Sequence, residues 1–309
     1  MAKLAKLIGL FCWLGLAFVA PLHAQPPHHP KVAFCAWGPM GFDLGISDAN
    51  GKVKMLTKNH FALFPYFSPD GQSLFFCQRA ESKFGRVSQI YRFDLQDRQM
   101  VRISDGSAID EYPICSPDGK HLAFISRPGD PKLKSYGYHI YIMDTAGKNR
   151  QAMKLGDDVP QLYPSWSPDG NKIVYCHLKL PWSGLKIYDL QKKTTVKLVP
   201  FYFYPMEAAW SPNGDEIAFT SWNPLTSTYC LWVVKPDGSD CRQLTEGPSD
   251  RQPSWFPDGR RLIFTRKDGE QNGLEQRGIY VIDLKTRKIT RAISIKDYRF
   301  LYPRVSLAH

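Results

Sequence analysis

The fold of this 309-residue chain is decided by one heptapeptide, Pro164-Ser-Trp-Ser-Pro-Asp-Gly170. The chain holds four close variants of it, at residues 65–71, 113–119, 208–214 and 253–259, and a truncated sixth copy, Pro303-Arg-Val-Ser306. The fourth position of each copy falls at residue 68, 116, 167, 211, 256 or 306. Successive copies are 44 to 51 residues apart. A repeat of about this length is typical of architectures in which one supersecondary unit is stacked against the next.

The residues of the heptapeptide predict a tight turn. Proline sets φ near about −65° at the second turn position, aspartate tolerates the third, and glycine adopts the left-handed conformation that returns the chain. An apolar strand follows each copy, as in Ile217-Ala-Phe-Thr220, then a loop, a second strand such as Leu231-Trp-Val-Val234, and a short outer strand such as Arg242-Gln-Leu-Thr245. Each repeat is therefore predicted to be four strands, a to d from the inside outward.

The inner strands are apolar runs rather than strict alternations, which is typical of sheets buried on both faces. The chain ends predict how the sheets are arranged. Val32–Trp37 resembles the b strand Ile217–Trp222 and is followed by strands c and d but preceded by no strand a, whereas Tyr302–Ser306 is an isolated strand a. A barrel or a sandwich would not explain two fragments that complement each other. We therefore predict an all-β fold, a six-bladed β-propeller of four-stranded blades over residues 32–309, closed by N-terminal strands b-c-d plus C-terminal strand a.

The N-terminus resembles a secretory signal. Lys3 and Lys6 precede the apolar run Leu7–Val19, and Ala24 lies at a plausible cleavage point. We expect residues 1–24 to be a signal peptide and residues 25–31 a short linker, so the protein would be periplasmic or secreted. An uncleaved membrane anchor is the alternative, but the run is shorter than the roughly 20 residues that span a bilayer.

The chain carries a net positive charge. Its formal charge of +11 would become +9 once Lys3 and Lys6 are removed with the signal. Basic proteins often bind nucleic acid, but an exported protein would not meet it, and we predict no nucleic-acid partner.

The repeat P-x-W-S-P-D-G, followed by I-A-F and I-Y-x-x-D, resembles the TolB-like propeller family of the bacterial envelope. Propellers of prolyl-oligopeptidase-like and tricorn-like proteases and of oligogalacturonate lyase share this style. The resemblance covers residues 32–309, without the separate N-terminal domain of TolB, for which Gln25–Lys31 are too few. It implies an envelope protein as partner, such as a peptidoglycan-associated lipoprotein.

Catalytic motifs are not found in the sequence. A nucleophile elbow G-x-S-x-G, a phosphate-binding loop and H-E-x-x-H are all missing. We therefore predict no catalytic residue, no metal and no cofactor, and leave open whether the protein is an enzyme. Cys35, Cys77 and Cys176 occupy one repeat position in different blades, which favours buried thiols over disulfides.

Loops are the expected binding elements, because variable loops on a rigid frame usually carry function. In this fold the b–c and d–a loops open on one face, which we call the loop face. Acidic residues are predicted to bind at its channel mouth: Asp105, Asp110, Glu111, Asp157, Asp158, Glu207 and Asp250. Basic and aromatic residues are predicted to bind at its rim: Arg86, Lys132, Lys134, Tyr136, Trp182 and Trp222.

From these features we predict an exported, monomeric TolB-like propeller that acts as a protein-interaction module in the bacterial cell envelope and binds through the loop face. The alternative is a carbohydrate-binding or oligogalacturonate-lyase-like propeller, since the aromatic loops also suit a saccharide. A purely structural envelope component is the third reading.

Overall fold

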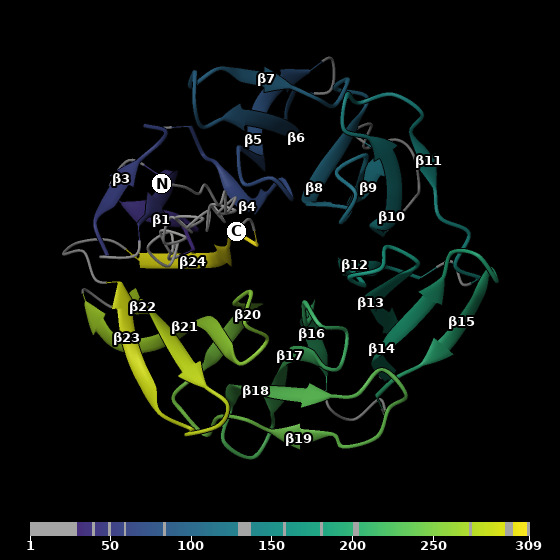
Figure 1. Cartoon of the computed structure of the whole chain (residues 1–309). Helices are drawn as coiled ribbons and strands as arrows, with labels where there is room; N and C mark the ends of the chain where they lie inside the picture. Colours follow the sequence, from purple (N-terminus) through teal and green to yellow (C-terminus); the bar gives the residue numbers. More distant parts are fainter. Residues whose placement is uncertain are drawn as a thin grey trace, which may run out of the picture.

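The structure is a computed structural model that describes residues 30–38, 41–48, 51–58, 60–82, 85–128, 137–156, 159–179, 182–199, 204–271, 274–293 and 299–307. These residues form six four-stranded antiparallel sheets arranged in a ring about a central channel (Figure 1). Within them there is no helix long and apolar enough to cross a membrane. The predicted signal, with its cleavage point at Ala24, lies outside the described residues.

Five blades are each built from one continuous stretch of chain. From the channel outward, blade 1 contains β4 (Leu63–Phe67), β5 (Ser73–Ser82), β6 (Gly85–Asp94) and β7 (Met100–Arg102), and blade 2 contains β8 (Ala108–Cys115), β9 (His121–Pro128), β10 (His139–Asp144) and β11 (Gln151–Ala152). Blade 3 contains β12 (Gln161–Trp166), β13 (Lys172–Lys179), β14 (Trp182–Asp189) and β15 (Thr194–Lys197), and blade 4 contains β16 (Pro205–Trp210), β17 (Ile217–Asn223), β18 (Thr228–Val234) and β19 (Arg242–Gln243). Blade 5 contains β20 (Asp250–Trp255), β21 (Arg261–Gln271), β22 (Leu274–Asp283) and β23 (Ile289–Ile293).

The sixth blade joins the two ends of the chain. The C-terminal strand β24 (Arg299–Val305) is its inner strand, followed by β1 (Val32–Gly38), β2 (Gly41–Ser47) and β3 (Val53–Met55). β24 pairs antiparallel with β1, with Val32 opposite Val305 and Trp37 opposite Arg299. The predicted fold class, blade number and mode of ring closure are therefore confirmed.

The a–b turns have the predicted chemistry. The five turn glycines, Gly71 to Gly259, have φ between 61° and 83°. In the turn of blade 1 the amide of Gln72 donates to Asp70 Oδ1 and the amide of Ser73 donates to Ser68 Oγ. The Ser68 hydroxyl also donates to Asp70 Oδ1, and this bond, together with that from the Gln72 amide, lowers the pKa of Asp70. Asp118 and Asp169 accept the corresponding amide bond in blades 2 and 3. We call the face of the ring that carries the a–b turns the turn face.

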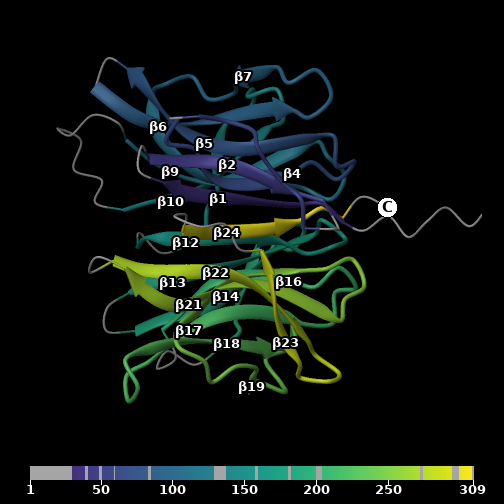
Figure 2. The same ribbon diagram turned by 90° about the vertical axis from the view of Figure 1, so that its left-hand side faces the viewer.

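Three of the b–c segments expected to be loops are strands. β5 and β6 pair out to Ser82 and Gly85, β13 and β14 out to Lys179 and Trp182, and β21 and β22 out to Gln271 and Leu274. An antiparallel ladder needs only backbone groups, and exposed side chains such as Arg79 and Glu81 remain solvated on the extended hairpin. Figure 2 shows these hairpins extending along the ring axis at its left side.

The core lies between neighbouring blades. Val174 and Leu185 of blade 3 pack with Ile217 and Phe219 of blade 4, and Ala218 and Leu231 of blade 4 pack with Phe264 of blade 5. Each sheet is thus buried on both faces, as its apolar runs predict. The six cysteines from Cys35 to Cys241 are free thiols.

Candidate functional site: a funnel in the central channel

Six residues of the inner strands share an unusual backbone conformation. Each inner strand has one non-glycine residue with φ between 52° and 62°, namely Phe64, Tyr112, Tyr163, Glu207, Gln252 and Tyr302. Each lies where the pairing of strands a and b shifts register, for example between Leu63 and Tyr66. A bulge that holds a bulky residue at positive φ costs about 1–3 kcal/mol, so its recurrence in every blade marks a built feature of the channel.

The aromatic members of this set contact one another. The ring centroids of Phe64 and Tyr112 lie 3.8 Å apart, those of Phe64 and Tyr302 4.5 Å, and those of Tyr112 and Tyr163 4.8 Å. Burial raises the pKa of Tyr112, Tyr163 and Tyr302, so these phenols are neutral. The four rings come from blades 1, 2, 3 and 6 and form a floor, the aromatic floor, between the two ends of the channel.

Glu207 is the member of this set in blade 4. Its side chain accepts from Arg251 Nη2 at 3.0 Å and from Thr220 Oγ1 at 2.9 Å, and it is 5% exposed. The guanidinium of Arg251 stacks on Tyr229 at 4.4 Å. The negative charge of Glu207 is therefore neutralised inside the protein.

Two other predicted mouth residues are also buried in ion pairs. Asp110 is 0% exposed and accepts two bonds from Arg150, at 2.8 and 2.9 Å. Asp250, also 0% exposed, accepts two bonds from Arg266, at 2.7 and 2.8 Å. Asp110, Asp250 and Glu207 lie within inner strands rather than in loops. Bidentate pairs of this kind hold strands together, and they leave little carboxylate free for a partner.

The remaining predicted loop-face residues are placed as follows. Asp105 is exposed, and Glu111 is half-buried beside Tyr138, whose pKa is raised by burial and by the charge of Glu111. Trp222 is half-buried and packs edge-on against Tyr229 at 4.9 Å. The backbones of Arg86 and Trp182 lie in β6 and β14. Asp157, Asp158, Lys132, Lys134 and Tyr136 lie outside the described residues. The binding roles of the whole set stay predictions.

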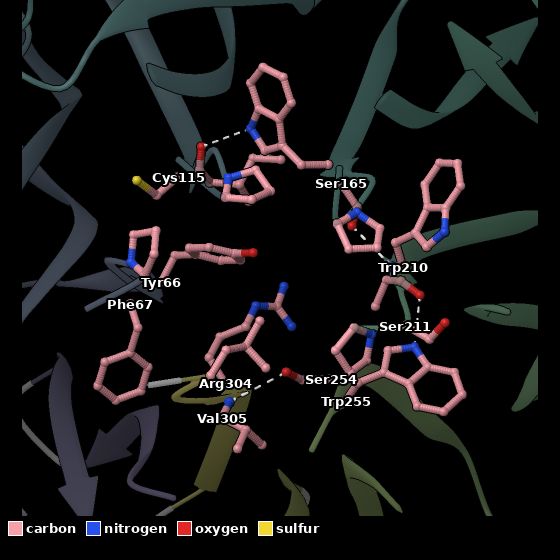
Figure 3. Close-up of a pocket in the computed structure, with 18 of the residues that line it drawn as sticks. Tyr66, Phe67, Cys115, Ser165, Trp210, Ser211, Ser254, Trp255, Arg304 and Val305 are labelled. Carbon is pink, nitrogen blue, oxygen red and sulfur yellow. Dashed lines mark hydrogen bonds between the residues drawn. The ribbon is translucent and has the colours of Figure 1, made fainter. Parts of the chain in front are cut away.

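A hollow lies at the opposite end of the channel, on the turn face. It is a funnel of about 300 Å³, which we call the turn-face funnel. The second residue of each repeat copy lines it: Tyr66, Ile114, Ser165, Ala209, Ser254 and Arg304. Its wall includes Pro69, Pro117, Pro168, Pro212, Trp166, Trp210 and Trp255 (Figure 3).

The tryptophans of the wall are fixed by hydrogen bonds to backbone carbonyls. Trp166 Nε1 donates to the carbonyl of Ile114 at 3.4 Å and Trp255 Nε1 to that of Ala209 at 3.0 Å, each across a blade boundary. Trp210 Nε1 donates to Gly214 at 3.2 Å. The indole rings are thus rigid apolar surfaces, because their polar atoms are already satisfied.

Sequence reasoning missed this funnel because it looked for variable loops. The available signal was the second position of the repeat, which changes from tyrosine to isoleucine, serine, alanine and arginine among the copies and so varies in both size and polarity. The described residues contain no group of three or more histidine, cysteine, aspartate or glutamate side chains arranged to hold a metal ion.

Six four-stranded blades around a partly filled channel define the chain as a β-propeller. Comparison with known families matches residues 129–308 to the family described as TolB beta propeller domain, so the chain belongs to the TolB β-propeller family. This confirms the resemblance inferred from the repeat.

Curated relatives are only partly aligned with the chain. An uncharacterised protein of Agrobacterium fabrum is 30% identical over 67% of this chain and 66% of its own length. The Tol-Pal system protein TolB of Bordetella pertussis is 31% identical over 43% of this chain and 31% of its length. An uncharacterised peptidase of Bacillus subtilis is 28% identical over 65% of this chain and 29% of its length. The chain thus spans less than two thirds of these relatives.

Solved structures agree on the fold. TolB from Acinetobacter baumannii is 19% identical with a TM-score of 0.76, covering 92% of this chain and 69% of that protein. An oligogalacturonate lyase in complex with manganese is 16% identical with a TM-score of 0.59, covering 86% of this chain and 74% of the lyase. At these identities the likeness extends to the fold alone.

Proposed function

We propose that this protein is an exported interaction module of the bacterial cell envelope and that it captures a protein partner in the turn-face funnel. The N-terminal segment supports export to the periplasm, and membership of the TolB β-propeller family supports an envelope protein, such as a peptidoglycan-associated lipoprotein, as partner.

The observation that carries this proposal is the contrast between the two ends of the channel. On the loop face, Asp110, Asp250 and Glu207 are buried and already paired with arginines. On the turn face, rigid tryptophans and prolines enclose a cavity into which a charged side chain, that of Arg304, projects (Figure 3). Concave, mostly apolar sites with a few polar groups are where ligands usually bind.

The test is a binding titration of the full chain with the purified peptidoglycan-associated lipoprotein of the same organism. Two variants separate the sites: Ala209→Phe partly fills the funnel, and the double variant Asp105→Lys, Glu111→Lys reverses charge on the loop face. We expect saturable binding to the unmodified chain, at least a tenfold loss in Ala209→Phe, and little change in the double variant. No saturable binding to the unmodified chain would contradict the proposal, and loss only in the double variant would return the site to the loop face.

A saccharide is the second candidate ligand, favoured by the three tryptophans of the wall and by the structural likeness to a lyase. Titration with oligogalacturonate distinguishes it. Tight binding of this sugar, abolished by Ala209→Phe, together with no binding of the lipoprotein, would support the carbohydrate reading instead.

A further inference from the structure

We propose that the turn-face funnel recognises the C-terminal carboxylate of an extended peptide segment, which the guanidinium of Arg304 and the phenol of Tyr66 would bind. This inference rests on the proposed function and specifies the chemistry of the same site.

The first observation is that Arg304 is a cation without a counter-ion among the residues that the structure describes. Its Nη1 makes long contacts with the carbonyls of Pro253 at 3.4 Å and Pro303 at 3.3 Å. No carboxylate of the described part of the chain forms an ion pair with it. Arg150, Arg266 and Arg251, on the other side of the aromatic floor, are each paired with a buried carboxylate. A guanidinium has five N–H donors in a planar fork, so most of the donors of Arg304 remain available to a ligand.

The second observation is the neighbouring phenol. Tyr66 lies on β4, and the contact of Phe64 with Tyr302 shows that β4 and β24 are adjacent inner strands. Figure 3 shows the side chains of Tyr66 and Arg304 both projecting into the middle of the funnel. Burial raises the pKa of Tyr66 to about 12, so it is a neutral O–H donor at pH 7. Within the described part of the chain, the Tyr66 hydroxyl has no hydrogen-bond acceptor, and the Arg304 side chain has none beyond the carbonyls of Pro253 and Pro303.

The charge of the site favours a single negative charge. Among the described residues that line the funnel, Arg304 is the one that is ionised at neutral pH. The turn aspartates Asp70, Asp118 and Asp169 surround the funnel on the turn face, although their carboxylates are bound by turn amides and do not line it. These aspartates would repel a dianionic phosphate more strongly than a carboxylate, and they would attract basic residues upstream of a peptide C-terminus.

The walls favour a peptide end over a sugar. The indole N–H groups of Trp166 and Trp255 are occupied by backbone carbonyls. The hydroxyl oxygens of Ser165 and Ser254 accept backbone amides, those of Trp210 and Val305. Few groups are therefore left for the many hydroxyls of a saccharide. An apolar terminal side chain, in contrast, would bury its surface against proline and tryptophan while its carboxylate meets Arg304.

The experiment compares matched peptides in calorimetric titrations of the full chain. The probes are acetyl-Lys-Ala-Pro-X peptides with X = Phe, Leu, Val or Ala, each made with a free C-terminal carboxylate and with a C-terminal amide. We expect at least one free-acid peptide to bind at least tenfold more tightly than its amide. Arg304→Gln should remove that preference, Arg304→Lys should keep part of it because the charge remains, and Tyr66→Phe should weaken the free acid by about threefold or more.

The matched control is Arg102→Gln, which removes one positive charge from an exposed position on β7; its affinities should not change. Thermal melting of each variant verifies folding, and Arg304→Lys keeps the test valid if Arg304→Gln melts early. The inference is overturned if every acid and amide pair binds equally, or if the preference survives in Arg304→Gln. It is also overturned if oligogalacturonate, and no peptide, binds in an Arg304-dependent manner.

Failure of this inference and failure of the proposed function give different results. One outcome is that the lipoprotein binds with an affinity that Ala209→Phe abolishes and Arg304→Gln leaves unchanged. In that case the funnel is a protein-binding site that does not recognise a carboxylate. If the lipoprotein does not bind at all, the proposed function itself is wrong.

Discussion

Removal of the inner strand β24 should open the ring, because this strand joins the two ends of the chain. Besides its ladder with β1, the amide of Tyr302 donates to Gln252 Oε1 at 2.9 Å in blade 5, and the amide of Ser306 donates to the carbonyl of Lys31 at 2.9 Å. Phe300 is 1% exposed and packs edge-on against Phe34 with centroids 5.3 Å apart.

The size of the effect follows from Phe300. Truncation of a buried phenylalanine to alanine costs about 3–5 kcal/mol, a large part of the roughly 5–15 kcal/mol that stabilises a typical domain. At about 2–3 °C per kcal/mol for a domain of this size, Phe300→Ala should lower the melting temperature by roughly 6–15 °C. Deletion of residues 299–309 removes the whole strand and should leave no cooperative unfolding transition at 37 °C.

The assay is thermal unfolding followed by circular dichroism and calorimetry. Val196→Ala is the matched control, since Val196 is 62% exposed on the outer strand β15 and its truncation should cost less than about 1 kcal/mol. Addition of a peptide of residues 299–309 to the truncated chain should restore part of the transition. An unchanged melting temperature in Phe300→Ala or in the truncation would refute closure by β24.

Three further predictions concern the buried pairs, the turns and the thiols. Asp250→Asn should destabilise the fold by about 3–5 kcal/mol in denaturant titration, because it leaves Arg266 unpaired, whereas Asp240→Asn, in an exposed pair with Arg242, should change it by less than about 1 kcal/mol; equal effects would contradict the assigned role of Asp250. Asp70, Asp118, Asp169 and Asp283 have folded-state pKa values below 3.8, that of Asp283 about 2, so their stabilisation is present above about pH 4 and should be lost as the pH falls toward 2; a melting temperature that is flat over that range would contradict this. Burial raises the pKa of Cys115 and Cys176 to about 12, so alkylation at pH 8 should modify the partly exposed Cys241 first and the buried thiols only after unfolding; rapid labelling of Cys176 would contradict its burial.

The fold could be predicted from the sequence because its turns are local. Ser167, Pro168, Asp169 and Gly170 determine one a–b hairpin by their own φ preferences and hydrogen bonds, without help from distant residues. Repetition of that turn then fixes the number of blades. The extent of the b–c hairpins could not be predicted, because an antiparallel ladder is made by backbone groups and the side chains do not mark where it ends.

The site could be predicted only in part, since its chemistry depends on partners far apart in the sequence. Asp110 pairs with Arg150, 40 residues later, and Glu207 pairs with Arg251, 44 residues later. Nothing local indicates that Tyr112 takes a positive φ, because the bulge that imposes it is a property of the paired strands. The acidic residues could be identified from sequence, but their neutralisation could not.

The most direct test of the account is the location of the partner. A photo-crosslinking amino acid placed at residue 209, in the turn-face funnel, or at residue 222, on the loop face, reports which end of the channel the peptidoglycan-associated lipoprotein contacts. Efficient crosslinking from position 209 and little from position 222, with competition by a free-acid peptide, is the predicted result. Crosslinking from position 222 alone would contradict the central claim that the funnel is the binding site.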